Sequence, residues 1–368
     1  MRNTTISISK GMAIIAMVIG HSECPEWLMQ AIYLWHMPLF FITAGYFFNV
    51  KYLNKEWEYI GHRFKGLYIP FVKWSIFFWL IHNLLFKLNI LNETFGNAAG
   101  GVTHPFVSVR DAMQHLFDIV FTMGGYDKFF LAAFWFLRAL LIASIAFLIL
   151  YKLFIKIKFL KTETSVIISI ALCAYILGML KCILGLSITN VVQGGAREIW
   201  GVFFICIGYL YRKYQEKIPQ GWVLSFIAVL VLAIAVIIGG ASMQYKPKLH
   251  DIFILPIPAV LGFILIHHLS SIVDKGKGLF KRFMVYCGDN TINIVIFHIA
   301  AFKIVSLTKI AWYGLDFKQI GCHMVVHYNS DSDYFWVLYS IVGVIIPLIG
   351  KYSVDKYKKR KSYERISD

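Results

Sequence analysis

The stretch KGMAIIAMVIGHSECPEWLMQAIYLWHMPLFFITAGYFFN, residues 10–49, indicates two apolar helices joined by a short polar turn. Each helix carries one histidine, His21 and His36. Lys10 lies eleven residues before His21, which corresponds to about 16 Å along a helix axis, or roughly half the hydrocarbon thickness of a bilayer. Ionisable groups at such depth mark a functional site. For either histidine alone, the alternative to a functional role is a structural one, in which the imidazole is hydrogen-bonded to a backbone carbonyl.

The composition places the chain among membrane proteins. Its 368 residues are 58% hydrophobic and only 15% charged, whereas about 25% of residues are charged in soluble domains. The basic residues behind the net charge of +16 lie between apolar runs, so they indicate topology and contact with anionic lipid, not binding to nucleic acid. We expect an all-α integral membrane protein without a metal. The six cysteines form no CxxC pair and are expected to be small packing residues.

We predict a single domain, residues 1–368, with about ten transmembrane helices and both termini cytoplasmic. The expected spans are approximately 6–22, 31–50, 66–86, 131–151, 164–184, 198–212, 222–241, 251–270, 288–308 and 334–350. With the N-terminus inside, the inner segments carry 24 of the 36 Lys and Arg residues and the outer segments carry 8, as the positive-inside rule requires. The longest outer loop, 87–130, is glycine-rich and polar at its middle, without helical periodicity. A basic tail, 351–368, lies at the inner face.

Two groups of ionisable residues are candidates for chemistry. His21, His36, Arg138 and His298 occupy similar predicted depths on four helices. Neutral His is a suitable base for a hydroxyl near pH 7, and a desolvated Arg or a second His can stabilise an oxyanion.

The second group, at the inner face, comprises Lys10, Arg63, Lys65 and Lys73. Lys and Arg in such a place suit a ligand with phosphates. The alternative is the positive-inside rule itself, which needs no ligand.

Four motifs carry a resemblance to a known family. They are Lys10-x10-His21, His36-Met37-Pro38 with Leu39-Phe40-Phe41 and Gly45-Tyr46, Trp135-Phe136-Leu137, and Gly288-Asp289-Asn290-Thr291 followed by His298. Together they resemble the membrane acyltransferase type 3 family, integral membrane enzymes with about ten spans. The resemblance implies transfer of an acyl group, usually acetyl, from cytoplasmic acyl-CoA to a hydroxyl of a cell-envelope polysaccharide or its lipid-linked precursor. It also implies a multi-pass location in the bacterial inner membrane.

The resemblance assigns the catalytic role to His21 and implies that Asn290 and His298 lie near the substrate. His36 and Arg138 are expected to support the oxyanion, Arg138 on its depth and residue type alone. The family commonly has Arg-x-x-Arg before the third span, for the acyl donor. This chain has Arg63-Phe64-Lys65-Gly66, so Lys65 or Lys73 is expected to replace the second Arg, beside Lys10. The acceptor sugar, the length of the acyl group, an acyl-enzyme intermediate and the oligomeric state stay open.

The alternative function is a multi-span transporter or exporter of a lipid-linked or small sugar, since intramembrane His, Lys and Arg would serve it equally well. Transporters often contain inverted repeats. The one internal echo is Phe40-Phe41-x-x-x-Gly45-Tyr46 against Phe203-Phe204-x-x-x-Gly208-Tyr209. We interpret it as ordinary helix packing, in which Gly lets two backbones approach.

Overall fold

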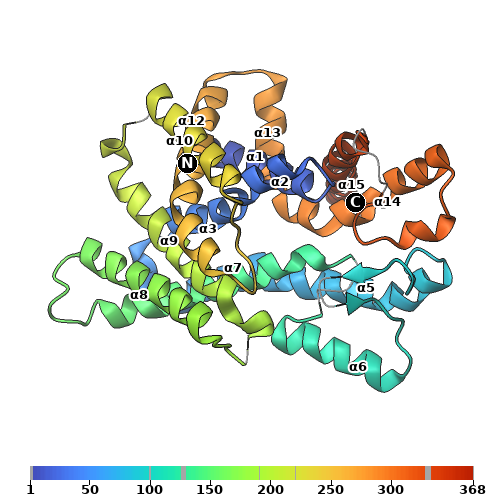
Figure 1. Ribbon diagram of the computed structural model, residues 1–368, viewed down its shortest axis with the longest axis horizontal. Coiled ribbons are helices and arrows are strands. Elements are labelled where there is room, and N and C mark those ends of the chain that lie inside the picture. The colour runs from blue at the N-terminus through green and yellow to red at the C-terminus, as the bar shows by residue number, and fades with distance from the viewer. Residues whose placement is uncertain are drawn as a thin grey trace.

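The computed structural model describes residues 3–98, 101–125, 130–189, 191–219, 221–327 and 333–367. These residues are almost entirely helical (Figure 1). The α-helices are α1 Thr4–Gly20, α2 Glu26–Tyr33, α3 His36–Tyr46, α4 Glu56–Arg63, α5 Ile69–Lys87, α6 Val109–Phe117, α7 Trp135–Phe154, α8 Glu163–Leu184, α9 Ala196–Tyr214, α10 Trp222–Ile237, α11 Leu249–Ile254, α12 Pro256–Lys275, α13 Leu279–Asp289, α14 Thr291–Tyr313 and α15 Phe335–Ser367. Two short strands, β1 Asn97–Ala98 and β2 Gly101–Val102, pair antiparallel.

Seven helical segments of the described residues are long and apolar enough to cross a membrane. They are Glu26–Tyr46, Glu56–Lys87, Ala132–Phe154, Glu163–Leu184, Pro256–Lys275, Thr291–Tyr313 and Phe335–Arg360. The helices α1 and α10 are apolar but shorter, and α9 overlaps the remaining expected span, 198–212. The all-α membrane class is therefore confirmed, while the count of about ten spans and the sides of the termini stay predictions.

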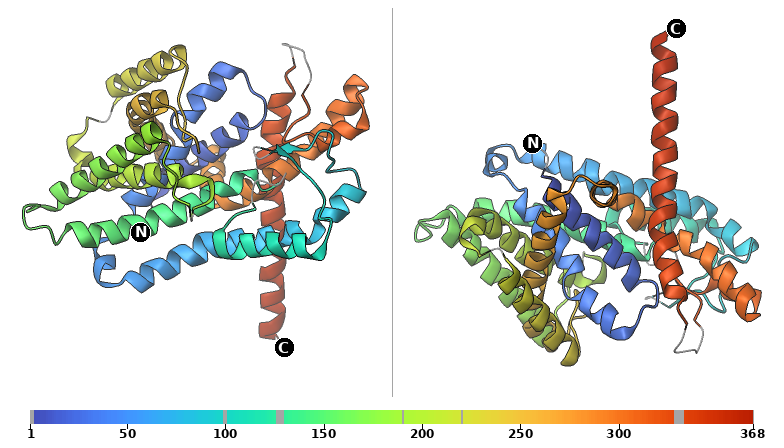
Figure 2. Two further views of the ribbon diagram at one scale, coloured as in Figure 1. Left: turned by 60° about the horizontal axis from the view of Figure 1, so that its bottom comes forward. Right: turned by 90° about the horizontal axis from the view of Figure 1, so that it is seen from above.

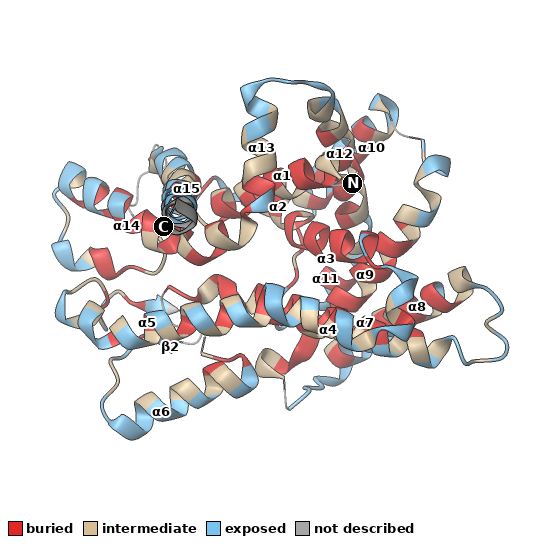
Figure 3. Ribbon diagram, turned by 180° about the vertical axis from the view of Figure 1, so that it is seen from behind, coloured by how far each residue is buried: buried red, intermediate tan, exposed pale blue. Residues whose placement is uncertain are grey.

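The buried core lies where α1, α3, α7 and α9 meet (Figure 3). Two glycines let α3 and α9 approach so closely that a Cβ at Gly45 would fall on the carbonyl oxygen of Ile205, and one at Gly208 on that of Ile42. These are the two glycines of the sequence echo. Helices in lipid associate through such small-residue contacts, because lipid tails are as apolar as the side chains that they replace. The echo thus marks a place where Gly lets two backbones approach, as the helix-packing interpretation expects.

A similar contact fixes α1. A Cβ at Gly11 would fall on the carbonyl oxygen of Met284 in α13, and a Cβ at Gly288 on that of Ser7 in α1. The same helix also contacts α3, α12, α14 and α15, so α1 is enclosed along most of its length. The C-terminal end of α1, where His21 follows, is thereby held against α14.

The segment 87–130 differs from the expected irregular loop. It contains the β1–β2 hairpin, the helix α6 and a π-helical turn, Asp118–Thr122; residues 99–100 and 126–129 lie outside the described ones. The indole Nε1 of Trp79 donates to the carbonyl of Ala112 at 2.9 Å, and the hydroxyl of Tyr68 donates to that of Val120 at 2.8 Å. The segment thus lies along α5 (Figure 2), where it accepts from Trp79 on α5 and from Tyr68 just before it.

The basic tail also has more structure than expected. The helix α15 continues without a break through Pro347 to Ser367, and its C-terminal part extends away from the other helices (Figure 2). Lys351 in α15 donates to Asp355 one turn later at 2.5 Å, a pairing that supports an isolated helix.

The pair Arg138 and Glu198 joins α7 to α9 inside the core. Arg138 Nε lies 3.0 Å from Glu198 Oε1, and the two side chains are 1% and 6% exposed. A buried ion pair gains little over an apolar pair of similar volume, but removing one partner leaves a buried charge uncompensated, which typically costs about 3–5 kcal/mol.

We therefore predict that Arg138→Met and Glu198→Met each lower the unfolding temperature in detergent, and that the double variant recovers most of the loss. Thermal scanning of the purified single and double variants measures this. Additive losses in the double variant would contradict a direct pairing.

Candidate active site

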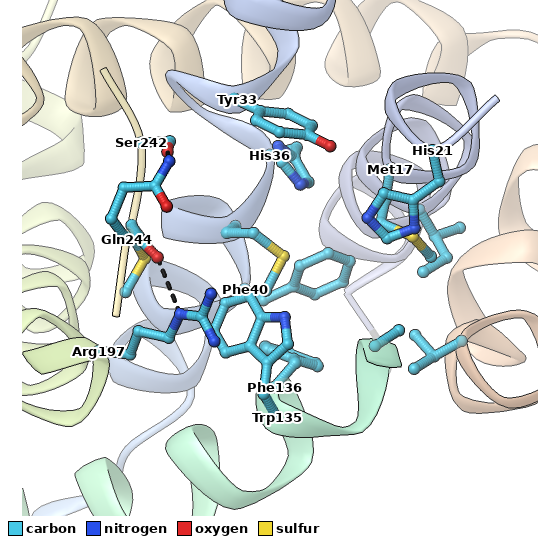
Figure 4. A pocket seen from close by; sticks show the side chains of 15 residues that line it. Met17, His21, Tyr33, His36, Phe40, Trp135, Phe136, Arg197, Ser242 and Gln244 are labelled. Carbon is cyan, nitrogen blue, oxygen red and sulfur yellow. Dashed lines mark hydrogen bonds between the residues drawn. The ribbon is translucent and has the colours of Figure 1, made fainter. Parts of the chain in front are cut away.

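A cavity of about 150 Å³ opens where α1, α3, α7 and α9 meet (Figure 4). The polar residues of its lining are His21, Tyr33, His36, Arg197, Ser242 and Gln244. Its apolar lining includes Met17, Phe40, Trp135, Phe136 and Val295. The two histidines of the opening stretch, separated in sequence by a turn and a short helix, thus face one space.

His21 directly follows α1 and pairs with a histidine of α14. Its Nδ1 lies 3.0 Å from Nε2 of His298, and the two rings stack with their centroids 5.2 Å apart. Nδ1 of His298 lies 3.0 Å from the carbonyl oxygens of Ile294 and Val295. A carbonyl only accepts, so Nδ1 of His298 carries the proton and its Nε2 accepts from His21 Nδ1–H. By this network, the Nε2 of neutral His21 keeps a lone pair.

His36 occupies the break between α2 and α3. Its Nδ1 lies 2.8 Å from the carbonyl oxygen of Ile32, so in the neutral ring this nitrogen donates and Nε2 keeps a lone pair. Pro38, two residues later, lacks an N–H and favours the start of a new helix here. The ring of Tyr33 packs on His36 with centroids 5.1 Å apart, and its hydroxyl donates to the carbonyl of Gly20 at 3.0 Å. Tyr33 therefore fastens the end of α1 to α2.

The positively charged residue that lines the cavity is Arg197. It directly precedes the expected span 198–212 and was therefore one of the eight basic residues of the expected outer segments. Its guanidinium lies 3.8 Å from the centre of the Trp135 ring. Nε donates to the carbonyl of Met243 at 3.0 Å, and Nη1 donates to Gln193 Oε1 at 2.9 Å. The feature of the sequence that points to this place is Gly194-Gly195, just before Arg197. The φ angles of these glycines, 74° and 81°, make the turn into α9.

Arg138 lies elsewhere. Within the described residues it is absent from the lining of this cavity, and its Nε pairs with Glu198 in the core. Of the four groups expected at similar depths, His21 and His36 line the cavity and His298 contacts His21, whereas Arg138 lies apart. The arginine in the described lining is Arg197.

Comparison with known proteins gives the family. A family model described as an acyltransferase domain matches residues 3–353, nearly the whole chain. The chain belongs to the membrane acyltransferase type 3 family. The nodulation protein NolL of Mesorhizobium japonicum is 27% identical over 106 residues, which are 25% of this chain and 28% of that protein. The match thus spans little more than a quarter of that relative, and no solved structure matches the chain.

A polar clamp holds the turn after His21. Glu23 has a left-handed φ of 65°. Its Oε2 lies 3.6 Å from Nζ of Lys309 in α14, and its Oε1 lies 2.5 Å from Nδ1 of His327. Lys309 is 1% exposed and also pairs with Asp333. Sequence reasoning missed this clamp because its members lie some 300 positions apart in the chain and share no motif.

The remaining predicted site residues lie apart from the histidine cavity. Asn290 donates from its side-chain amide to the carbonyl of Tyr286 at 2.9 Å and ends α13. Arg63 lies over the ring of Tyr59, 5.0 Å from its centre, and Lys65 is exposed on the π-helical turn Phe64–Tyr68.

Lys10 and Lys73, the other two residues of the expected inner group, lie in different environments. Lys10 is half-buried on α1. Lys73 lines a separate cavity of about 680 Å³ between α5, α14 and α15, together with Lys351 and Lys358. Among the described residues, no group of three His, Cys, Asp or Glu side chains is arranged to hold a metal ion.

The Glu23–His327 contact predicts a pH-dependent stability. The hydrogen bond that His327 donates to the Glu23 carboxylate raises the pKa of His327 above its ordinary value. A histidine whose pKa rises on folding stabilises the folded protein below its unfolded pKa of about 6.5, and this stabilisation is lost as the pH rises through the folded pKa. The unfolding temperature of the wild type should therefore exceed that of His327→Gln more at pH 5.5 than at pH 8.5. An equal difference at both pH values would contradict the contact.

Proposed function

We propose that the chain is an integral membrane O-acyltransferase of the bacterial inner membrane. It transfers an acyl group, most simply acetyl, from cytoplasmic acyl-CoA to a hydroxyl of a cell-envelope polysaccharide or its lipid-linked precursor. The observation that carries the proposal is the chain of hydrogen bonds from the Ile294 and Val295 carbonyls through His298 to His21. It leaves Nε2 of His21 as the proton acceptor at a cavity.

In the proposed reaction, His21 Nε2 takes the proton of the acceptor hydroxyl as its oxygen attacks the thioester carbonyl. The resulting imidazolium still donates from Nδ1 to His298 Nε2, which orients the ring as the carboxylate does in a serine-protease triad. The C–S bond of the tetrahedral intermediate then breaks, and His21 returns the proton to the leaving CoA thiolate. The products are the ester and free CoA.

The oxyanion needs a donor that lines the cavity. Arg197 meets this requirement, and a guanidinium keeps its positive charge in any protein environment. We therefore transfer to Arg197 the role that the sequence suggested for Arg138. Neutral His36 donates to Ile32 through Nδ1, so its free Nε2 accepts. We propose that it orients the acceptor hydroxyl toward His21.

The cavity that Lys73 lines suits the acyl donor. Three lysines, Lys73, Lys351 and Lys358, meet an apolar wall that includes Trp74 and Phe297, a combination that fits phosphates beside a pantetheine arm and an acyl chain. Phe297 in α14 precedes His298, so one helix contributes to both the donor cavity and the base. We propose that Lys73 replaces the missing second Arg, with Lys10, Arg63 and Lys65 as further cations of the inner face.

The base is tested with His21→Ala. Because general-base catalysis typically contributes about 10²–10⁴ in rate, the variant should lose at least 10²-fold in acceptor-dependent CoA release, with expression and acetyl-CoA binding near normal. Wild-type activity should also fall as the pH drops, since protonation removes the lone pair of Nε2. A His21→Ala protein that still acylates its glycan at near the wild-type rate would rule out this mechanism and would favour the transporter function.

The donor cavity is tested with Lys73→Ala. Loss of one phosphate-pairing cation should raise the KM for acetyl-CoA about tenfold, in line with the roughly 1.5–3 kcal/mol of a charged hydrogen bond. Lys356→Ala is the matched control, because Lys356 is an exposed lysine of α15 absent from the described lining of this cavity. Equal KM values for the two variants would mean that Lys73 does not bind the acyl donor and contributes only to membrane topology.

A further inference from the structure

A second space lies beside the histidine cavity. It is a cleft of about 650 Å³ between the C-terminal end of α8, the turn before α9 and residues 245–247. Its polar lining includes Ser187, Thr189, Gln193, Tyr245 and Lys246. None of these residues has a role in the acyl-transfer steps described above.

The cleft and the histidine cavity share a wall. Arg197 lines the cavity, while its Nη1 donates to Gln193 of the cleft at 2.9 Å. Its guanidinium lies 3.8 Å from the ring centre of Trp135 in the cavity and 5.7 Å from that of Tyr245 in the cleft. The segment 242–247 continues this wall, since its first three residues line the cavity and its last three line the cleft.

The volumes of the two spaces suit ligands of different size. Pockets that enclose a small ligand typically measure about 300–1,000 Å³. The histidine cavity, at about 150 Å³, holds the reacting groups but not a sugar chain as well. The cleft, at about 650 Å³, lies within the range for a bound ligand. An acceptor that is longer than one sugar therefore needs a neighbouring space, and this cleft adjoins the cavity through Arg197.

The chemistry of the cleft favours an uncharged, hydroxyl-rich ligand. The amine of Lys181 donates to the carbonyl of Leu186, so this cation of the lining is engaged within the protein. The other cation, Lys246, has its Nζ 5.6 Å from the centre of the Tyr245 ring. The remaining polar groups of the lining are hydroxyls, an amide and the tyrosine ring. An aromatic ring with a polar tip provides both an apolar face and a hydrogen bond, which suits the two faces of a sugar.

Local contacts hold the walls of the cleft in place. The thiol of Cys182 in α8 donates to the carbonyl of Pro247 at 3.1 Å, and the backbone N–H of Ile188 donates to the carbonyl of Gly194 at 3.1 Å. Gly194 has a φ of 74°, a conformation that most side chains disfavour. The two sides of the cleft are thus connected to α8 and to the start of α9.

We propose that this cleft is the acceptor subsite, and that it binds the uncharged sugar units next to the one whose hydroxyl reaches His21. The inference rests on the proposed acyl transfer and adds the place where the acceptor chain lies. Tyr245 packs on a sugar ring, the hydroxyl and amide groups of the cleft bind sugar hydroxyls, and Arg197 separates this chain from the reacting ester.

Equilibrium binding without acetyl-CoA tests the cleft. The probe is a set of fluorescently labelled oligosaccharides, cut from the envelope glycan of the producing cells and freed of esters by mild alkali. They are titrated onto the full chain in detergent micelles. We expect Tyr245→Ala and the space-filling Thr189→Trp each to raise the Kd at least tenfold, and Tyr245→Phe, which keeps the ring, to stay within about threefold. Tyr334→Ala, at a 74% exposed tyrosine at the start of α15, is the matched control and should bind as the wild type does.

The outcomes separate the two proposals. Equal Kd values for the wild type, Tyr245→Ala and Thr189→Trp, at unchanged unfolding temperatures, would overturn the acceptor subsite, as would an absence of binding to the wild type. Binding that requires acidic sugars and is lost in Lys246→Ala would overturn the uncharged class of ligand. A wild type that binds the probes through the cleft but releases no CoA from acetyl-CoA would refute the acyl transfer and leave the sugar-binding cleft standing.

Discussion

The hydrogen bond between His21 and His298 depends on two backbone carbonyls of α14, and the proposed chemistry depends on that bond. Because Ile294 and Val295 accept from one side of His298, the opposite nitrogen of the ring is left to accept from His21. A carboxylate in this place would carry a charge that is costly to bury in a membrane. A neutral histidine fixed by carbonyls orients His21 without that charge.

This bond forms only if α1 and α14 are held at a fixed depth and rotation. Hydrophobic burial does not hold helices together in lipid, so close backbone contact must. Gly11 and Gly288 supply it between α1 and α13, as Gly45 and Gly208 do between α3 and α9. The polar clamp at Glu23 then secures the turn that follows His21. Helix packing and catalysis are thus linked, because the contacts that exclude lipid also set the distance between the two rings.

Arg138 and Arg197 illustrate what residue type and depth leave open. Both are arginines near the N-terminal ends of apolar helices, and the residue next to Arg197, Glu198, binds Arg138 in the core. The sequence favoured Arg138 because it lies inside an expected span. The direction of a side chain around its helix, however, follows from the neighbouring helices. The segment 87–130 is a similar case: its glycine-rich middle suggested an irregular loop, but Trp79 on α5 and Tyr68 just before it donate to α6 and the turn beside it.

The sequence by itself determined the membrane class and the approximate places of the helices, and it singled out His21, which lines the cavity. Apolar run length and charge bias are local properties of the chain that the bilayer imposes directly, and the Lys10-x10-His21 spacing is a local motif. Only the tertiary structure decided which ionisable groups meet. The partner of His21 lies 277 positions away, and the cavity takes its cation from the first turn of α9 instead of α7. Such meetings depend on the rotation and close approach of several helices at once, which no local pattern encodes.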